Sequence, residues 1–186
     1  MIYLVAMDIG FTATGITIWE LTSDGYRLEN LWCVKPARIK KTKKMSQADV
    51  DAAVISESAR SIVEFIMPYL PMGIVAEMPT GGSKSSRATR CMGMGSAMIV
   101  TLATLMKIPC EWYTPFDIKK VVTGVNSGNK DEMMTAMADK FPELLAFPKN
   151  MMEHIADSCA CWLAAQDGEM IGNLENKKEF ANGTRP

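Results

Sequence analysis

Two carboxylates in this 186-residue chain stand directly at the ends of short apolar runs. Asp8 follows the run Ile2–Met7, and Glu77 follows the run Met72–Ala76. Continuous apolar runs of this length are typical of buried strands. Because an unpaired buried charge is costly, acids at such positions usually have a function. If the two strands are parallel neighbours, about 4.8 Å apart, their carboxylates meet at the sheet edge where α/β proteins bind ligands.

A third group of polar side chains comes late in the chain. His154 and Asp157 are three residues apart, so they share one face of a predicted helix, with Glu153 beside them. Asp157 lies within an otherwise apolar stretch, which argues against a surface position. Three or four hard ligands of this kind suit Mg²⁺ or Mn²⁺. The alternative stays open that each strand-end acid begins a turn and that the lone histidine is structural.

Basic residues are concentrated locally in a chain that is almost neutral overall. There are 20 Lys and Arg against 21 Asp and Glu, so the net charge of −1 does not indicate a nucleic-acid partner. Between Leu31 and Ala48, however, there is no acid. A local basic segment can bind a polyanion, and the alternative is a solvated loop. The basic residues of this segment are Lys35, Arg38, Lys40, Lys41, Lys43 and Lys44.

Composition limits the remaining possibilities. A chain that is 48% hydrophobic and 22% charged suits one globular domain at this length. No run approaches 18 apolar residues, and the N-terminus lacks the basic region of a signal peptide, so neither a membrane span nor a leader is expected. Five cysteines without a CxxC pair indicate reduced thiols, and we expect a cytoplasmic protein.

The elements that must position these groups alternate along the chain. Strands are expected over 2–7, 15–21, 26–34, 72–76 and 110–113. Helices are expected from a capping box at Ser46 to Pro68, over 86–106, for a turn from Pro115, over 130–141 and, as the last helix, over 150–166. This order predicts an α/β domain with a five-stranded mixed sheet flanked by helices, in which the fourth strand is parallel to the first. The tail from Asp167 is expected to be polar and frayed.

Four motifs, in order and at matching spacing, resemble those of the RuvC family of Holliday junction resolvases in the RNase H-like superfamily. Residues 8–15 resemble its opening D-x-G-x-x-x-T-G, and Glu77 resembles its strand-end glutamate. Residues 113–124, followed by Lys130, resemble its Y-x-P…V-K-x-x-V-x-G stretch. Residues 154–160 resemble its final D/H-x-x-D-A-x-A motif, in the variant that begins with histidine. The resemblance covers residues 1–166 as a single nuclease domain, leaves 167–186 as a polar tail, and points to a divergent, bacteriophage-type member.

The resemblance implies an RNase H-like fold and metal-dependent phosphodiester hydrolysis at four-way DNA junctions. The expanded basic segment extends the expectation to other branched DNA. Asp8, Glu77, His154 and Asp157 would form the catalytic metal site, with two Mg²⁺ ions that Mn²⁺ could replace. One ion would activate water and the other would stabilise the leaving 3′-oxygen. DNA contacts are expected from Lys40, Lys41, Lys43, Lys44, Lys84, Arg87, Arg90, Lys119 and Lys130.

The role of the helix 86–106 and the activity of the chain both stay open. The resemblance implies a homodimer formed through the helix 86–106, but its small residues Gly93, Gly95, Ser96 and Ala97 could equally serve packing inside the domain. The chain could also be an inactive relative that only binds branched DNA. A phosphate-binding ATPase domain like those of Hsp70 and sugar kinases is a third reading, since D-x-G-x-T opens their phosphate loop. Those proteins need a second such motif, which this sequence lacks.

Overall fold

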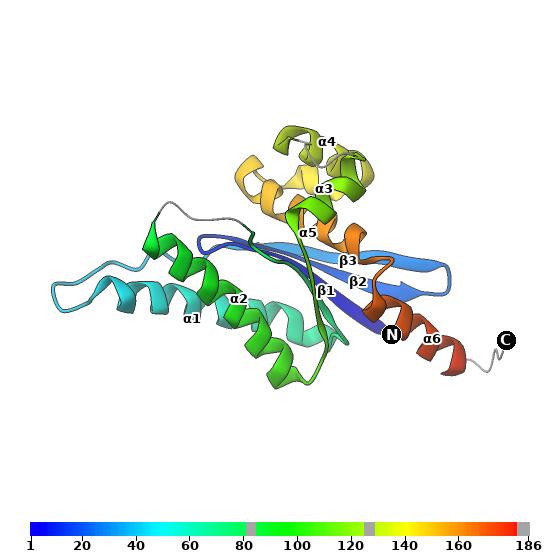
Figure 1. The fold of residues 1–186 in the computed structure, drawn as a ribbon, viewed down its shortest axis with the longest axis horizontal. Coiled ribbons are helices and arrows are strands. Elements are labelled where there is room, and N and C mark those ends of the chain that lie inside the picture. Colours follow the sequence, from blue (N-terminus) through cyan, green and yellow to red (C-terminus); the bar gives the residue numbers. More distant parts are fainter. Residues whose placement is uncertain (81–84, 125–128, 182–186) are drawn as a thin grey trace.

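A five-stranded mixed sheet forms the centre of the molecule, and helices cover both of its faces (Figure 1). The computed structural model describes residues 1–80, 85–124 and 129–181, with side chains to residue 176. The strands are β1 (Ile2–Ile9), β2 (Thr14–Thr22), β3 (Gly25–Val34), β4 (Ile74–Glu77) and β5 (Cys110–Tyr113). Their order across the sheet is β3-β2-β1-β4-β5. The predicted α/β architecture with a five-stranded mixed sheet is confirmed.

The register of the sheet brings the two strand-end acids to one edge. β1, β2 and β3 form an antiparallel meander, while β4 lies parallel to β1, as predicted. Met7 pairs with Ala76, so Asp8 and Glu77 occupy the next positions on the two neighbouring strands. Asp8 lies within β1 rather than at its end, because Asp8 and Ile9 still pair with residues of β2.

Successive residues of β1 alternate between two hydrophobic clusters, as the two-residue period of a strand requires. Leu4 and Ala6 belong to the cluster under α5, whereas Val5 and Met7 belong to the cluster under α1 and α2. The sheet is therefore buried on both faces, which explains the unbroken apolar runs in the sequence.

The helices match the predicted pattern except near the C-terminus. They are α1 (Gln47–Ile66), α2 (Ser86–Met106), α3 (Pro115–Thr123), α4 (Lys130–Lys140), α5 (Lys149–Ala165) and α6 (Glu169–Ala181), with short 3₁₀ turns η1 (Met67–Tyr69) and η2 (Pro142–Ala146). The predicted capping box at Ser46 is present at the start of α1. Pro115 begins a nine-residue helix, which is longer than the single turn expected.

The prediction of a frayed tail after residue 166 was wrong. Residues from Glu169 form α6, and Met170, Ile171 and Leu174 are buried in the cluster under α5. The few apolar residues of this segment stand among many polar ones and gave too weak a periodic signal. Their burial depends on the surface that the sheet and the preceding helix offer, which is a tertiary effect.

Helix α2 presents one face to the sheet and another to solvent. Gly95 is buried, and a Cβ atom there would lie 2.9 Å from Ile9 Cγ2, so this glycine serves packing inside the domain. A Cβ atom at Gly93 would meet nothing within 4 Å. By length and composition α2 could cross a membrane, although 33% of its most apolar window is buried. Core helices share this composition, so it does not by itself indicate a membrane.

Candidate active site

Asp8 and His154 form the central contact of the site at the carboxyl edge of the sheet. Asp8 Oδ2 lies 2.7 Å from His154 Nδ1, and the two side chains are 16% and 27% exposed respectively. This bond holds the imidazole against the strand-end carboxylate and raises the pKa of His154. The two residues are 146 positions apart in sequence, and the fold brings them into contact.

The glycines of the opening motif allow this close approach. A Cβ atom at Gly15 would lie 1.8 Å from His154 O, so only glycine lets α5 pack against β2 at this point. A Cβ atom at Gly10 would lie 2.3 Å from Ala13 O, which explains the tight turn after β1. Thr14 Oγ1 donates to Gly10 O across that turn at 3.3 Å. The motif is thus a steric requirement of the site.

A buried hydroxyl fixes α5 to the sheet beside Asp157. Ser158 Oγ donates to Ala6 O at 2.8 Å and lies 2.9 Å from Thr17 Oγ1. Both hydroxyl-bearing residues are fully buried. Because Ser158 follows Asp157 directly, these bonds set the rotation of α5 and direct Asp157 toward β1 and β4. Sequence analysis did not single out Ser158 or Thr17.

The carboxylates of the site repel one another. Burial, together with the charges of Asp8 and Asp157, raises the pKa of Glu77 to about 8. Burial and the charge of Asp8 raise the pKa of Asp157 to about 7. The charges of Lys119 and Lys130 act in the opposite direction on Glu77. The four predicted residues Asp8, Glu77, His154 and Asp157 therefore share one electrostatic environment.

The donor set suits a hard divalent cation. Carboxylate oxygens are the ligands that Mg²⁺ and Mn²⁺ prefer, and a cation would stabilise the ionised form of the two carboxyl groups whose pKa values burial and neighbouring charges raise. In residues 1–80, 85–124 and 129–181, no three His, Cys, Asp or Glu side chains form a group that could hold a metal as they stand. The hydrogen bond to His154 occupies Asp8 Oδ2, so a cation at Asp8 would need its other oxygen or a turned imidazole.

Two lysines stand at the rim of the acidic cluster. Lys130 begins α4 and donates to Glu153 on α5, which raises the pKa of Lys130 and lowers that of Glu153. Glu153, whose role the sequence left open, thus holds Lys130 near the site. Lys119 lies on α3, whose first turn is fixed by a capping box between Thr114 and Asp117.

A second cationic region lies at the start of α2, around a buried acid. Asp51 of α1 is completely buried and accepts hydrogen bonds from Arg87 and Arg90. The shortest of these are 2.7 Å to Arg87 Nη2 and 2.6 Å to Arg90 Nη2. Both arginine side chains remain about half exposed, at 52% and 45%. The arginines pull the pKa of Asp51 far below its usual range, so it stays ionised.

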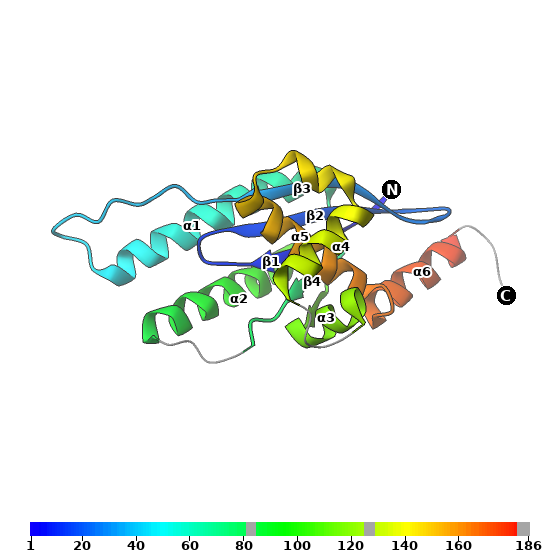
Figure 2. The same cartoon turned by 90° about the horizontal axis from the view of Figure 1, so that it is seen from above.

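The basic segment before α1 is exposed and close to this region. In the described part of the chain, its lysines at 40, 41, 43 and 44 have no ion-pair partner. A cavity of about 790 Å³ joins the segment to α1 and α2, and Figure 2 shows the segment extending beside the N-terminal ends of both helices. Lys84 lies outside the described residues. The cavity is lined by Arg38, Ile39, Lys40, Lys41, Gln47, Val50 and Arg87.

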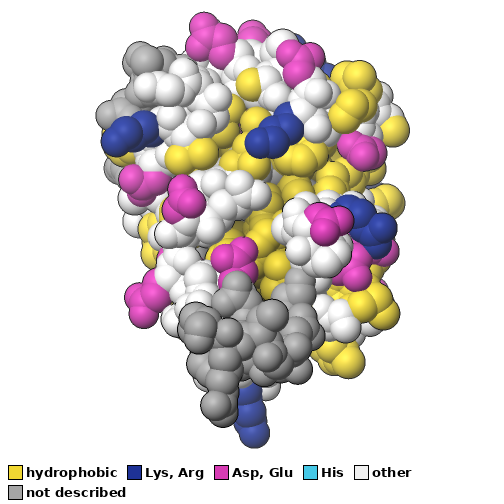
Figure 3. Space-filling model, turned by 90° about the vertical axis from the view of Figure 1, so that its right-hand side faces the viewer, with side chains coloured by type: hydrophobic (Ala, Val, Ile, Leu, Met, Phe, Trp, Pro, Cys, Tyr) yellow, Lys and Arg dark blue, Asp and Glu magenta, His cyan; other side chains and the backbone are white. Residues whose placement is uncertain are grey.

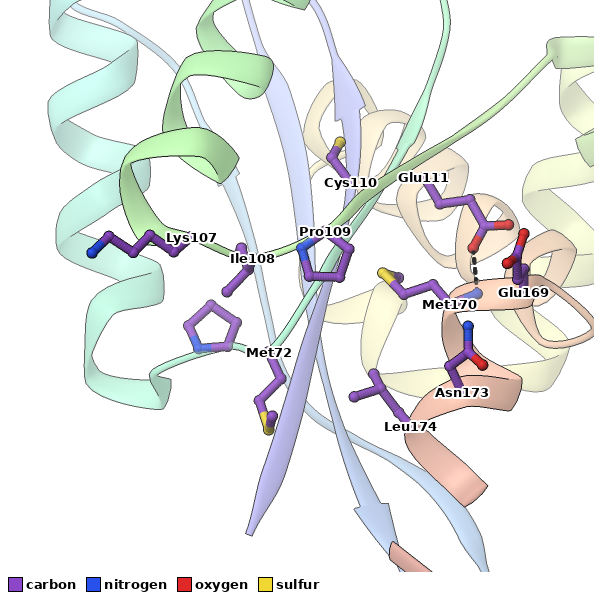
Figure 4. A pocket seen from close by; sticks show the side chains of 11 residues that line it. Met72, Lys107, Ile108, Pro109, Cys110, Glu111, Glu169, Met170, Asn173 and Leu174 are labelled. Atoms are coloured by element: carbon purple, nitrogen blue, oxygen red, sulfur yellow. Dashed lines mark hydrogen bonds between the residues drawn. The ribbon is translucent and has the colours of Figure 1, made fainter. Parts of the chain in front are cut away.

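Another cavity, of about 540 Å³, lies at the opposite, amino end of β4 and β5. Figure 4 shows Met72, Pro109 and Cys110 on one side and Met170 of α6 on the other. Glu111 accepts a hydrogen bond from the Met170 backbone at 3.3 Å. The face around α6 carries apolar side chains between scattered charges (Figure 3).

Comparison with known proteins agrees with this architecture. No family model and no curated protein matches the sequence. Among solved structures, Thermus thermophilus RuvC in complex with a Holliday junction substrate superposes with a TM-score of 0.65 at 17% identity, covering 92% of this chain and 97% of that one. The yeast mitochondrial Holliday junction resolvase gives a TM-score of 0.60 at 14% identity, covering 95% and 83%. The fowlpox virus Holliday junction resolvase gives 0.53 at 14% identity, covering 89% and 99%.

These matches define the fold class. The chain has an RNase H-like fold, an α/β sheet with acidic residues at one edge. More narrowly, its fold is that of the RuvC-type Holliday junction resolvases, along almost the whole chain. The resemblance drawn from the four motifs is confirmed at the level of the fold.

Proposed function

We propose that this protein is a metal-dependent endodeoxyribonuclease that cuts Holliday junctions and other branched DNA by phosphodiester hydrolysis. The observation that carries the proposal is the cluster of Asp8, Glu77, His154 and Asp157 at the carboxyl edge of the sheet. Three carboxylates with two lysines beside them are the groups that would bind a cation and a phosphate. The shared fold with resolvases adds independent support.

Each residue then has a defined task. Asp8, Glu77 and Asp157 would hold the divalent cations, with Mg²⁺ the expected ion and Mn²⁺ its substitute. Such cations would supply an activated water and stabilise the leaving 3′-oxygen. His154 fixes the orientation of the Asp8 carboxylate through its 2.7 Å bond and is placed to accept or release a proton there. Lys119 and Lys130 bind phosphate oxygens at the rim.

The DNA-binding surface extends from the site over two cationic regions. One is the exposed basic segment with Lys40, Lys41, Lys43 and Lys44, and the other is the pair Arg87 and Arg90. Phosphate contacts of this type position DNA without reading its sequence. A solved relative by fold was captured with a Holliday junction substrate, which supports branched DNA as the partner.

The protein is proposed to act as a homodimer through α2. The outer face of α2 carries no charged side chain from position 93 onward to Met106, and Val100 and Leu105 are 49% and 74% exposed. The hydroxyls of Thr101 and Thr104 bond back to the helix's own carbonyls, leaving methyl groups outward. A two-fold dimer also matches the near-symmetry of a four-way junction. Light scattering at micromolar concentration should give twice the chain mass of 20.5 kDa, and a monomer mass would contradict the dimer.

The deciding experiment compares labelled four-way, three-way and linear duplex DNA, each with and without Mg²⁺. We expect cleavage of the branched substrates only with the ion present, and no cleavage by Asp8→Asn. Tight junction binding without cleavage by the wild type, under Mg²⁺ and Mn²⁺ alike, would favour the inactive DNA-binding relative.

A further inference from the structure

A small cavity lies at the start of α2, against Phe11 in the turn between β1 and β2. Its volume is about 240 Å³, below the roughly 300–1,000 Å³ of pockets for drug-sized ligands. It therefore suits one ring system rather than a larger molecule. Its lining combines an aromatic ring, a guanidinium group and two sulfur-containing side chains. The lining residues are Phe11, Ser85, Arg87, Ala88, Cys91 and Met92.

Phe11 connects this cavity to the proposed catalytic centre. It lies in the turn between β1 and β2, three residues after Asp8, and its side chain is only partly buried. A Cβ atom at Gly10 would lie 3.7 Å from His154 Cε1, so the backbone just before Phe11 passes the catalytic imidazole. In Figure 2 this turn lies between the N-terminal parts of α1 and α2. A group bound against Phe11 would be within a nucleotide's reach of the acidic cluster.

Arg87 is held in a fixed plane against Phe11. Its Nε lies 3.2 Å from each carboxylate oxygen of Asp51, and its Nη2 lies 2.7 Å from Oδ1. This fork of bonds to a fully buried carboxylate fixes the guanidinium plane. The Arg87 Cζ lies 5.9 Å from the centre of the Phe11 ring, within the usual range of a cation–π contact. The arginine is thus preorganised, although half of its side chain faces solvent.

Arg87 also belongs to a second cavity, of about 790 Å³, that Arg38, Lys40 and Lys41 line. Through Arg87, the small cavity with its aromatic ring therefore adjoins a larger cavity whose lining includes three further basic side chains. The aromatic cavity could take a base, and the basic side chains of the larger cavity could take the phosphate next to it.

We propose that Phe11 and Arg87 form a stacking site for one unpaired nucleobase of the DNA branch point, with Asp51 as the residue that positions Arg87. This inference rests on the proposed function. Stacking on aromatic and guanidinium planes accepts any base, since every base has a π-face. A base inside a continuous duplex has both faces covered, so the site selects DNA with an opened branch point over linear duplex.

The test is a thermodynamic cycle between protein and DNA, measured as junction affinity in EDTA so that no strand is cut. Phe11→Leu keeps an apolar side chain but removes the π-face, and Phe11→Trp restores it. On the DNA side, an abasic nucleotide replaces each branch-flanking base in turn. We expect Phe11→Leu to weaken binding of the intact junction on the order of 10-fold. When the abasic position removes the stacked base, wild type and Phe11→Leu should bind the junction equally. Phe11→Trp should bind the intact junction like the wild type.

Two further variants separate stacking from general damage. Tyr3→Leu removes a partly buried aromatic ring at the opposite end of β1 and should leave junction affinity unchanged. Asp51→Asn should lose the same base-dependent part of the affinity as Phe11→Leu, which mere loss of stability would not produce. An equal loss for intact and abasic junctions at every position, or no loss at all, would overturn the stacking site. If wild-type protein fails to prefer four-way junctions over linear duplex, the proposed function itself fails.

Discussion

The two ends of the central sheet differ in how their charges are satisfied. At the carboxyl end of β1 and β4, the repelling carboxylates of Glu77 and Asp157 have pKa values raised to about 8 and about 7. At the amino end of β4 and β5, a cavity of about 540 Å³ is lined mainly by apolar side chains. Its carboxylate Glu111 bonds to the backbone of α6.

This comparison shows that the size of a cavity alone does not identify the functional site in this fold. The amino-end cavity has a volume of about 540 Å³, yet the hydrogen bond described there, from the Met170 backbone to Glu111, fixes α6 to the sheet. At the carboxyl end, burial and neighbouring negative charges raise two carboxyl pKa values, and such shifts cluster at functional sites. We therefore expect substitutions at the carboxyl end to change catalysis, and those at the amino end to change stability.

The largest expected effect is the loss of cleavage on neutralising a carboxylate of the site. Asp8→Asn and Glu77→Gln keep the side-chain shape but remove a ligand charge. Cleavage of a four-way junction should fall on the order of 1,000-fold or more, since a single preorganised electrostatic contact in an active site is worth about 10²–10³. Junction affinity should change little, because phosphate contacts carry it. Gel-shift and single-turnover cleavage assays measure the two quantities separately.

Glu111→Gln provides the matched control at the other end of the sheet. It removes one carboxylate charge from β5 but touches no group of the acidic cluster, so cleavage should stay within about two-fold of wild type. A loss of cleavage as large as that of Glu77→Gln would erase the contrast between the two ends.

Much of the candidate site at the carboxyl end could be predicted from the sequence because its signals are local. Apolar runs marked β1 and β4, the helical spacing linked His154 with Asp157, and Gly10 and Gly15 matched positions of the opening motif. The contacts that hold these groups in place could not be predicted. Asp51 lies 36 residues from Arg87, and nothing in the sequence around either one indicates the other.

The next effect concerns the amino end and the stability of the fold. Leu174 of α6 is 5% exposed and packs in the cluster under α5. Leu174→Ala should lower the free energy of unfolding by about 2–4 kcal/mol, the usual cost of removing a buried leucine side chain. Cleavage at 25 °C should be unaffected. Urea unfolding gives the first quantity, and unchanged stability would show that α6 frays as the sequence had suggested.

A smaller effect follows from the raised pKa of Glu77. Here the substitution that removes the proposed ligand charge should stabilise the fold at high pH. Its pKa rises from about 4.5 in the unfolded chain to about 8 in the folded protein, so folding binds a proton more tightly. Stability therefore falls as pH rises between these values and levels off above pH 8. Gln cannot ionise, so at pH 9 the melting temperature of Glu77→Gln should be higher than that of the wild type, on the order of 5 °C. At pH 5, where Glu77 is protonated in the folded protein, the two melting temperatures should be about equal.

The melting experiment is done in EDTA, and a second series contains Mg²⁺. A bound cation offsets the repulsion among the carboxylates and so stabilises the wild type. It should therefore reduce the difference in melting temperature between wild type and Glu77→Gln at pH 9. If the difference in melting temperature between wild type and Glu77→Gln stays the same from pH 5 to pH 9, burial and the neighbouring charges do not raise the pKa of Glu77 as described.

The two ends also show where sequence patterns lose their predictive power. The C-terminal helix α6 was missed because its few apolar residues become buried only by packing on a surface that other elements form. Phe11 fell inside a recognised motif at a position that the motif leaves free, so the pattern gave it no role. Only the fold reveals that its ring meets Arg87 from a different part of the chain.

The smallest expected effect lies outside both ends, in the exposed basic segment, and it tests whether DNA affinity is separate from the catalytic edge. Lys40, Lys41, Lys43 and Lys44 are all exposed and supply no ligand to the acidic cluster. Each lysine that neutralises a phosphate contributes a slope of about −0.9 in log affinity against log salt. Replacing all four by glutamine should flatten the slope by about one unit per genuine contact, and equally for junctions of different sequence. Cleavage at saturating protein should stay near the wild-type rate. A solvated loop without DNA contacts would leave the slope unchanged, and a fall in the saturated rate would mean that the segment also shapes the catalytic edge.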